Sequence, residues 1–274
     1  MLCIECLQMT KAWTPFSFIR YFFFSLAGGM LALQIGFILQ ILLLSVSNPI
    51  STSFITNEYI RLCKNSRDCS IKKTWVNYED IGYPIKKAVI ASEDANFVEH
   101  KGIEVESLLK AWERNNKKGK FIAGGSTITQ QLAKNLYLSS EKNYLRKAQE
   151  LALTFYIESF LDKQRIFEIY LNVVEWGEGI FGIQEASKYY YAKDANQLTN
   201  YQAARLAAAL PAPKCFDDDI YCGHININFS KKTSTIAKRM GVADIPSDDG
   251  LGKYIQKNKK RYKNIIVRTN LDDL

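Results

Sequence analysis

Histidine is scarce in this 274-residue sequence, which contains only His100 and His224. Neither lies at a spacing from the six cysteines that is typical of a zinc site, so a protein-bound zinc is not expected. Alternating, strand-like patterns are also few, the best candidate being residues 220–229, and no internal repeat is visible. The scarcity of strand-like patterns favours a mainly helical fold.

Charge is missing from a long N-terminal stretch. Between Tyr21 and Asn57 there is no Asp, Glu, Lys, Arg or His, and the most apolar part, residues 21–46, exceeds the roughly 20 residues that a helix needs to cross a bilayer. A cleaved signal peptide is the alternative, with residues 45–47 (Ser-Val-Ser) as its cleavage site. Its apolar region would be far longer than the usual ~7–15 residues. We therefore expect an uncleaved membrane anchor, although basic residues on both sides leave its orientation open.

Acidic residues are outnumbered by basic ones, and the chain has a net charge of +8 and a pI near 9.0. This balance suits an acidic partner: nucleic acid, an anionic membrane surface or a phosphorylated substrate. The anchor disfavours the first, so no nucleic-acid partner is expected.

The cysteines form locally spaced pairs. After the anchor, Cys63 lies close to Cys69 and Cys215 close to Cys222. Two small disulfide loops would suit an oxidising compartment, with free thiols as the alternative. Cys3, before the anchor, would remain reduced together with its neighbour at position 6.

The composition changes along the chain and predicts five segments. They are a cytoplasmic tail at 1–20, the transmembrane anchor at 21–46, a linker at 47–57, a globular body at 58–240 and a polar, basic tail at 241–274.

A helix is predicted to begin after two glycines in the stretch AGGSTITQQLAKN, residues 123–135, with Ser126 as its N-cap. At roughly 100° per residue, Thr127, Gln131 and Lys134 lie on one side of this helix. The glycines would allow a ligand or another backbone to approach its start. The pattern therefore indicates an anion-binding stripe.

Three further helix features can be predicted. Residues 143–161 are nearly apolar all round after Glu150, which is typical of a helix in the middle of a core. Asp162 is placed to cap the following segment, and Thr199 with Gln202 forms a capping-box pattern.

Two acidic positions are candidates for chemistry, and each has a plain structural alternative. Ser92 could cap a helix whose first turn holds Glu93 and Asp94. Arg146 and Glu150 could form an i,i+4 ion pair on a solvated face. Because the second helix is otherwise apolar, Glu150 is expected to line a cleft instead.

Paired carboxylates are the usual catalytic groups for reactions at the anomeric carbon of a sugar. Beside them, Thr127, Gln131, Lys134 and Arg146 would hold negative charge. Sugar chemistry with an anionic leaving group at a membrane indicates a lipid-linked sugar diphosphate as the substrate.

Five motifs in order resemble those of the peptidoglycan glycosyltransferases. They are EDANFVEHKG (93–102), GGSTITQQLAKN (124–135), RKAQE (146–150), KQRIFEIYLN (163–172) and ARLAAALPAP (204–213). With its anchor and single catalytic domain, the chain is similar to the monofunctional biosynthetic transglycosylases of that family. A Ser-x-x-Lys pattern begins at Ser70, but no Lys-Thr-Gly partner accompanies it, so no transpeptidase activity is expected.

The resemblance implies a mainly α, lysozyme-like domain at 58–240, with a smaller lobe that dips into the membrane beside the anchor. It implies polymerisation of lipid II with inversion at C1, with a partly desolvated Glu93 as the general base. Lys134 and Arg146 would bind the diphosphate with help from Thr127 and Gln131. Glu150 would orient Arg146 or the acceptor.

Other expectations follow from the same resemblance. Residues expected to shape the site are Asp94, Phe97, His100, Gly125, Ser126 and Asn135. Glu150 would help to bind a divalent metal, Mg or Mn, and no organic cofactor is expected. The partners would be lipid II, the growing strand, the bilayer and other cell-wall synthesis or division proteins. The catalytic domain would lie on the periplasmic side of the cytoplasmic membrane.

Two rival functions remain. A membrane-anchored lytic transglycosylase or lysozyme-like hydrolase would explain Glu93 but not the cluster around Lys134. A non-catalytic cell-wall scaffold would not need intact acids at positions 93 and 150.

Overall fold

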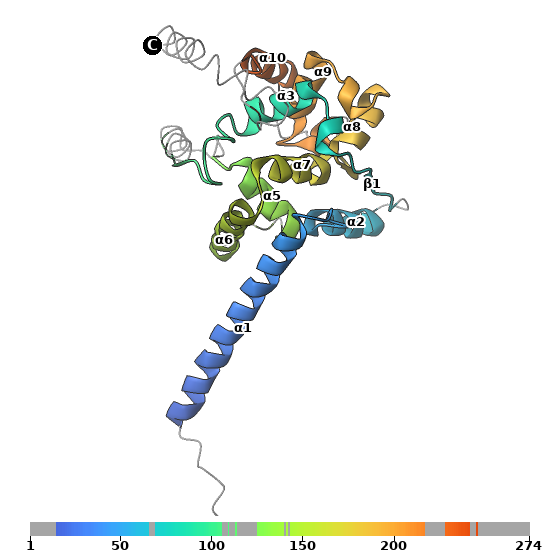
Figure 1. The fold of residues 1–274 in the computed structure, drawn as a ribbon. Coiled ribbons are helices and arrows are strands. Elements are labelled where there is room, and N and C mark those ends of the chain that lie inside the picture. Colours follow the sequence, from blue (N-terminus) through green and yellow to red (C-terminus); the bar gives the residue numbers. More distant parts are fainter. Residues whose placement is uncertain are drawn as a thin grey trace, which may run out of the picture.

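The computed structural model describes residues 15–65, 69–105, 125–139, 143–216 and 228–241, together with residues 109, 113, 141 and 245. Helix α1, Pro15–Leu43, projects as a single rod from a helical body (Figure 1). Its apolar part, Phe18–Leu43, has a mean hydropathy of 2.0 and is almost entirely exposed. The long apolar helix is confirmed, but it starts before residue 21 and ends before residue 46. The hydroxyls of Ser45 and Ser47 bond to carbonyls of its last turn, and these bonds favour an end at Leu43.

The body is mainly α, as predicted. Its elements are α2 (Ser53–Asn65), β1 (Lys72–Lys73), η1 (Tyr78–Asp80), α3 (Tyr83–Glu93), α5 (Ile128–Tyr137), α6 (Tyr144–Phe160), α7 (Lys163–Val173), β2 (Glu175–Gly177), β3 (Ile180–Phe181), α8 (Ile183–Tyr191), η2 (Ala195–Gln197), α9 (Asn200–Ala209), η3 (Pro213–Cys215) and α10 (Phe229–Arg239).

A small sheet with strand order β1-β3-β2 lies beside the helices. Strand β3 pairs parallel to β1 and antiparallel to β2. The sequence did not predict these strands, because two or three residues are too few to show alternation. The strand predicted at 220–229 lies outside the described residues except at its end, where Asn228 caps α10.

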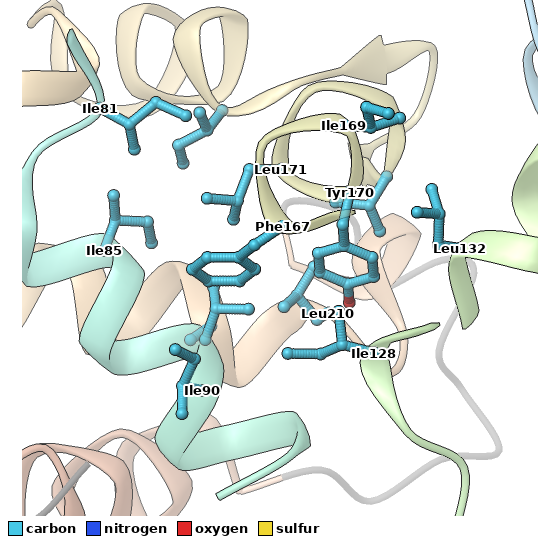
Figure 2. Close-up of a cluster of buried hydrophobic side chains, with 14 of the residues drawn as sticks. Ile81, Ile85, Ile90, Ile128, Leu132, Phe167, Ile169, Tyr170, Leu171 and Leu210 are labelled. Carbon is cyan, nitrogen blue, oxygen red and sulfur yellow. The ribbon is translucent and has the colours of Figure 1, made fainter. Parts of the chain in front are cut away.

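Helix α7 lies at the centre of the core, with side chains of α3 and α5 and Leu210, the C-cap of α9, gathered round it (Figure 2). Phe167 and Tyr170 are fully buried on this helix, and their rings stack 6.5 Å apart. Phe97, expected to shape the site, is also fully buried with its ring 5.5 Å from that of Phe167. The first motif is therefore attached to the core through its aromatic residue.

The predicted helix caps agree with the structure in two of three cases. Asp162 accepts a hydrogen bond from the backbone of Arg165, and Thr199 forms its capping box with Gln202. The prediction of Ser126 as the cap of α5 was wrong, since Thr127 is the N-cap. A capping box needs Glu or Gln three residues after the N-cap. Gln130 lies at that position relative to Thr127, whereas Ser126 has a threonine there.

Helix α6 was wrongly predicted to be buried all round. Leu153 and Ile157 face the core, whereas Leu145 and Phe155 are exposed. The helix lies beside the upper part of α1 (Figure 1), where the amides of Gln149 and Gln34 pair at 3.0 Å. The apolar residues of α6 therefore lie on two faces. One face packs into the core, and the other is exposed.

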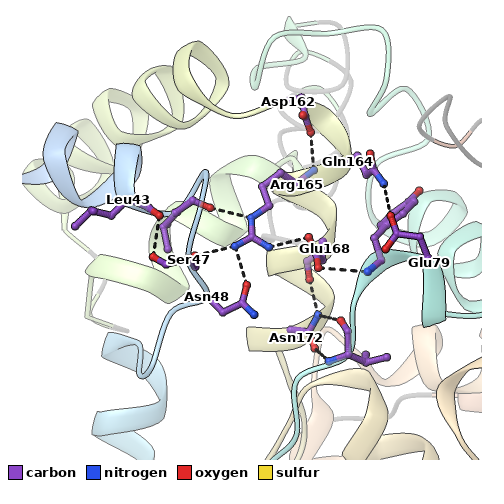
Figure 3. A network of polar contacts seen from close by, with 12 residues as sticks. Leu43, Ser47, Asn48, Glu79, Asp162, Gln164, Arg165, Glu168 and Asn172 are labelled. Carbon is purple, nitrogen blue, oxygen red and sulfur yellow. Dashed lines mark hydrogen bonds and ion pairs between the residues drawn. The ribbon is translucent and has the colours of Figure 1, made fainter.

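Arg165 attaches the core to the segment that follows α1 (Figure 3). Its guanidinium donates to the carbonyls of Leu44 and Ser47 at 2.8 and 2.7 Å and to the Asn48 side chain at 2.8 Å. Glu168, one turn along α7, accepts the remaining bond at 2.7 Å. The chain that leaves the anchor is thus bound to the central helix.

The disulfide prediction is confirmed for the first pair, because Cys63 and Cys69 are bonded. Cys215 is also in a disulfide, while its predicted partner Cys222 lies outside the described residues.

Candidate active site

Glu93 is the last residue of α3, and Asp94 is its C-cap. The alternative in which Ser92 caps a helix and the two acids occupy its first turn is therefore wrong. The Ser92 hydroxyl instead donates to Glu93 Oε1 at 2.9 Å. Glu93 is half-buried, which agrees with the partial desolvation expected of it.

Gln131 connects Glu93 to the core. Its Nε2 donates to Glu93 Oε2 at 3.0 Å, and its Oε1 accepts from the Tyr170 hydroxyl at 2.9 Å. Burial raises the pKa of Tyr170 well above its usual value, and the charges of Glu93 and Asp94 add to the rise. The phenol therefore stays protonated and fixes the amide with its NH₂ towards Glu93.

Asp94 joins the end of α3 to the start of α5. Its Oδ2 accepts from the backbone of Ile128 at 3.0 Å, and its Oδ1 lies 2.8 Å from His100 Nε2. Because His100 Nδ1 accepts from the backbone of Gly102, the proton of the neutral ring belongs on Nε2, which donates to Asp94. These contacts support a shaping role for Asp94 and His100.

The residues of the predicted anion-binding stripe on α5 have different surroundings. The buried Thr127 hydroxyl donates to the Gly102 carbonyl at 2.6 Å and accepts from the backbone of Gln130. Lys134 is half-buried, with its ammonium 5.2 Å from the centre of the Phe54 ring. Thr127 and Gln131 thus hold the site together, and their action on a diphosphate remains a prediction.

Arg146 and Glu150 form the i,i+4 ion pair on α6, but Glu150 is buried and Arg146 half-buried, so the pair is not on a solvated face. Arg146 Nη1 donates to Glu150 Oε2 at 2.8 Å, and Lys147 binds the other oxygen. The Nε of Arg146 is buried and has no hydrogen-bond partner among the described residues. An anion could therefore bind at this guanidinium while Glu150 orients it.

A cavity of about 230 Å³ opens beside Glu93. Gly125 and Ser126, expected to shape the site, line it, while Asn135 is buried farther along α5. Sequence reasoning missed its other wall, where Arg239 of α10 lines the cavity.

Helix α10 brings a second basic side chain to this region. Lys232 donates to the Ala208 carbonyl at 3.0 Å, and burial lowers its pKa while the charge of Glu93 opposes the shift. The sequence contained one signal for these two basic residues. Lys232 and Arg239 are two turns apart on a helix capped by Asn228, which predicts that they share a face.

The fold and site define a class of protein: a helical enzyme with a candidate membrane anchor and a carboxylate beside a cluster of cations. The model of the transglycosylase family matches residues 61–241. Two similar proteins are biosynthetic peptidoglycan transglycosylases from Cupriavidus. The one from C. metallidurans is 58% identical over 80% of this chain and 94% of its own length, and the one from C. pinatubonensis is 54% identical over 86% and 94%. A third, from Ralstonia nicotianae, carries the same name and is 54% identical over 80% and 94%.

The chain belongs to the transglycosylase family, whose peptidoglycan-synthesising members are glycosyltransferases. The resemblance drawn from the five motifs is thereby confirmed, and the alternatives of a lytic enzyme and a scaffold are not favoured.

Proposed function

We propose that this glycosyltransferase polymerises lipid II into β-1,4 glycan strands, with Glu93 as the general base. The observation that carries the proposal is the half-buried Glu93 carboxylate beside a cavity, held by Gln131 and, through it, by Tyr170. A base held in this way keeps its position while a proton is transferred.

The reaction is a single displacement. Glu93 takes the proton from the 4-hydroxyl of the acceptor sugar as that oxygen attacks C1 of the growing strand. The bond between C1 and the diphosphate oxygen breaks as the new bond forms on the opposite face. The α-linked donor therefore gives a β-linked product with inversion, and no covalent enzyme intermediate is needed.

The leaving diphosphate needs positive charge more than it needs a proton. Lys134 on α5 and Arg146 on α6 supply it, and the Nε of Arg146, which has no hydrogen-bond partner among the described residues, provides a donor for a phosphate oxygen. Glu150 acts by holding the guanidinium, which makes it a positioning residue.

A divalent ion was expected with the diphosphate, and Glu150 does not fit the role of its protein ligand. Both carboxylate oxygens are taken by Arg146 and Lys147. The described residues contain no cluster of three or more His, Cys, Asp or Glu side chains that could hold a metal. No step is assigned to a metal, and a requirement for Mg or Mn carried by the substrate remains a proposal.

We propose that the enzyme acts on its lipid-linked substrate at the outer face of the cytoplasmic membrane. Helix α1 is long and apolar enough to span it, and Leu145 and Phe155 are exposed on α6, the helix that contacts α1 through Gln149. The disulfide of Cys63 and Cys69 supports a periplasmic, oxidising side for the catalytic domain. Other cell-wall synthesis or division proteins are proposed as partners on functional grounds.

The test uses full-length protein in detergent with labelled lipid II and magnesium, and it separates the products by size. Wild-type protein and Glu99→Gln, an exposed acid in the same motif, should make long strands, whereas Glu93→Gln should make none and keep its helical content. Lys134→Ala should bind lipid II more weakly without losing the fold. Full activity of Glu93→Gln would contradict the assignment, and cleavage of preformed glycan without polymer would indicate a lytic enzyme.

A further inference from the structure

One side of α1 contacts the helical body. Most side chains of this helix are exposed, but Gln34 and Phe37 are half-buried, and Ile41 and the following Leu44 are buried. Their spacing of three or four residues places them on the same side of the helix. The Phe37 ring lies 5.5 Å from that of Tyr137, the last residue of α5. The end of α1 is therefore packed against the body along one defined face.

Gln34 is a polar residue on this face, and its amide pairs with that of Gln149 on α6. Gln34 Nε2 donates to Gln149 Oε1 at 3.0 Å, and Gln149 Nε2 donates back to Gln34 Oε1 at 3.3 Å. Gln34 precedes the last residue of α1 by nine positions, which is about 14 Å at roughly 1.5 Å per residue. In the apolar surroundings of a membrane helix a separated amide finds few other partners, so the pair connects α1 to α6 at a defined point.

The two halves of α6 are held in different ways. Leu153 and Ile157, in the C-terminal half, are fully buried in the core. Tyr144 and Leu145, in the first turn, are exposed. Gln149 lies between these two parts, so its bond to Gln34 supports the half of α6 that is less deeply packed.

Gln149 is also next to the groups that we expect to act on the leaving diphosphate. Glu150 follows it directly, and Arg146 lies one turn before it. Glu150 is buried and accepts from Arg146 Nη1 at 2.8 Å. A shift of the N-terminal half of α6 would therefore move the Arg146 guanidinium relative to Lys134 on α5.

We propose that Gln34 is a positioning residue for the transfer reaction: through Gln149 it holds the N-terminal half of α6 and keeps Arg146 where the leaving diphosphate develops its charge. This inference rests on the proposed function. Negative charge on the leaving oxygen grows as the bond to C1 breaks, so a misplaced guanidinium costs more in the transition state than in the ground state. Loss of the Gln34 amide should lower kcat more than it raises KM.

A contact that only fastened α1 to the body would behave differently, because other contacts already do so. Arg165 binds the carbonyls of Leu44 and Ser47, and Ile41 is fully buried. Helix α1 should stay attached when the Gln34 amide is removed, and the melting temperature should stay close to that of wild type. A fall in kcat without a fall in melting temperature then separates positioning from stability.

The test compares Gln34→Met, Gln149→Met and the double variant as full-length proteins in phospholipid nanodiscs, with labelled lipid II at several concentrations. Methionine is unbranched, so it removes the amide and keeps most of the bulk. Each single variant should lower kcat about three- to tenfold, as expected for an interhelical hydrogen bond in a membrane, with KM within about twofold of wild type. The double variant should lose no more than either single variant, because Gln34 acts through Gln149. Gln40→Met, at an exposed glutamine of the same helix, is the matched control and should behave as wild type.

Hydrogen exchange gives a second measurement that needs no turnover. The backbone amides of residues 144–150 should exchange several-fold faster in Gln34→Met and in Gln149→Met than in wild type. Those of α7, at the centre of the core, should not change.

A kcat of Gln34→Met equal to that of Gln40→Met would overturn the proposal. Losses that multiply in the double variant would also overturn it, as would a lower melting temperature with faster exchange throughout the body. Wild-type protein that makes no polymer would reject the proposed function instead. In that case, faster exchange of residues 144–150 in Gln34→Met would retain Gln34 as the support of α6, and unchanged exchange would reject it.

Discussion

The side-chain amide of Gln131 donates to the carboxylate of Glu93 at 3.0 Å, and the two residues come from helices that begin 45 residues apart. This contact makes α5 a support for the end of α3. It also explains why an amide in the second motif matters for a carboxylate in the first.

Tyr170→Phe tests how this support works. The variant keeps the buried ring and removes the hydroxyl that fixes Gln131, so the amide is free to turn away from Glu93. We expect stability to fall by about 1 kcal/mol and kcat by about tenfold, with little change in KM. Steady-state polymerisation and thermal unfolding check this, with Tyr201→Phe, an exposed tyrosine on α9, as the control. A kcat equal to that of wild type would show that the Tyr170 hydroxyl does not position the base.

Glu58→Gln should reduce stability in a way that depends on pH. Burial alone would raise the pKa of Glu58, but hydrogen bonds from Arg61 and Lys214 outweigh it and hold the pKa below its usual value. A lowered pKa in the folded state means stability that is present above the unfolded pKa and is lost as the pH falls through the folded one. The loss should be about 1–3 kcal/mol at pH 7 and much smaller at pH 3, by denaturant unfolding. An equal loss at both pH values would contradict the ion-pair explanation.

Gly102→Ala should destabilise the first motif. Gly102 has φ of +81°, and a Cβ there would lie 2.6 Å from Thr154 Cγ2. Backbone strain and this clash should cost at least about 1 kcal/mol and disturb the bond from Thr127. Gly241→Ala is the matched control, because its Cβ would approach nothing closer than 3.7 Å. Thermal unfolding of both variants separates the two sites, and equal melting temperatures would reject the argument.

Arg165→Lys should loosen the connection between anchor and core. A lysine keeps the charge but cannot reproduce the planar set of donors to Leu44, Ser47 and Asn48. We expect limited proteolysis between residues 44 and 52 to become several-fold faster. Arg205→Lys, on α9 and remote from the linker, should be cleaved as wild type is. Unchanged cleavage in Arg165→Lys would show that the linker is held by other contacts.

Local patterns predicted much of the fold. The apolar run predicted α1, Asp162 predicted the start of α7, and Thr199 with Gln202 predicted the start of α9. These features depend on residues a few positions apart, so the sequence contains all the information that they need.

Predictions that depended on distant residues were less accurate. The apolar face of α6 could not be divided between core and anchor until α1 lay beside it. Arg239 could not be assigned to the wall beside Glu93, because its spacing from Lys232 predicts a shared face of α10 but not which distant segment that face meets.

The sequence by itself therefore determined the long apolar helix, the helical body and the acids and cations available for chemistry, since composition and periodicity are local properties. The tertiary structure decided that Gln131 holds Glu93, that Thr127 caps a helix, and that Arg239 lines the cavity beside Glu93. Each of these depends on which neighbours a side chain meets, and only packing of distant segments sets its burial, hydrogen bonds and charge.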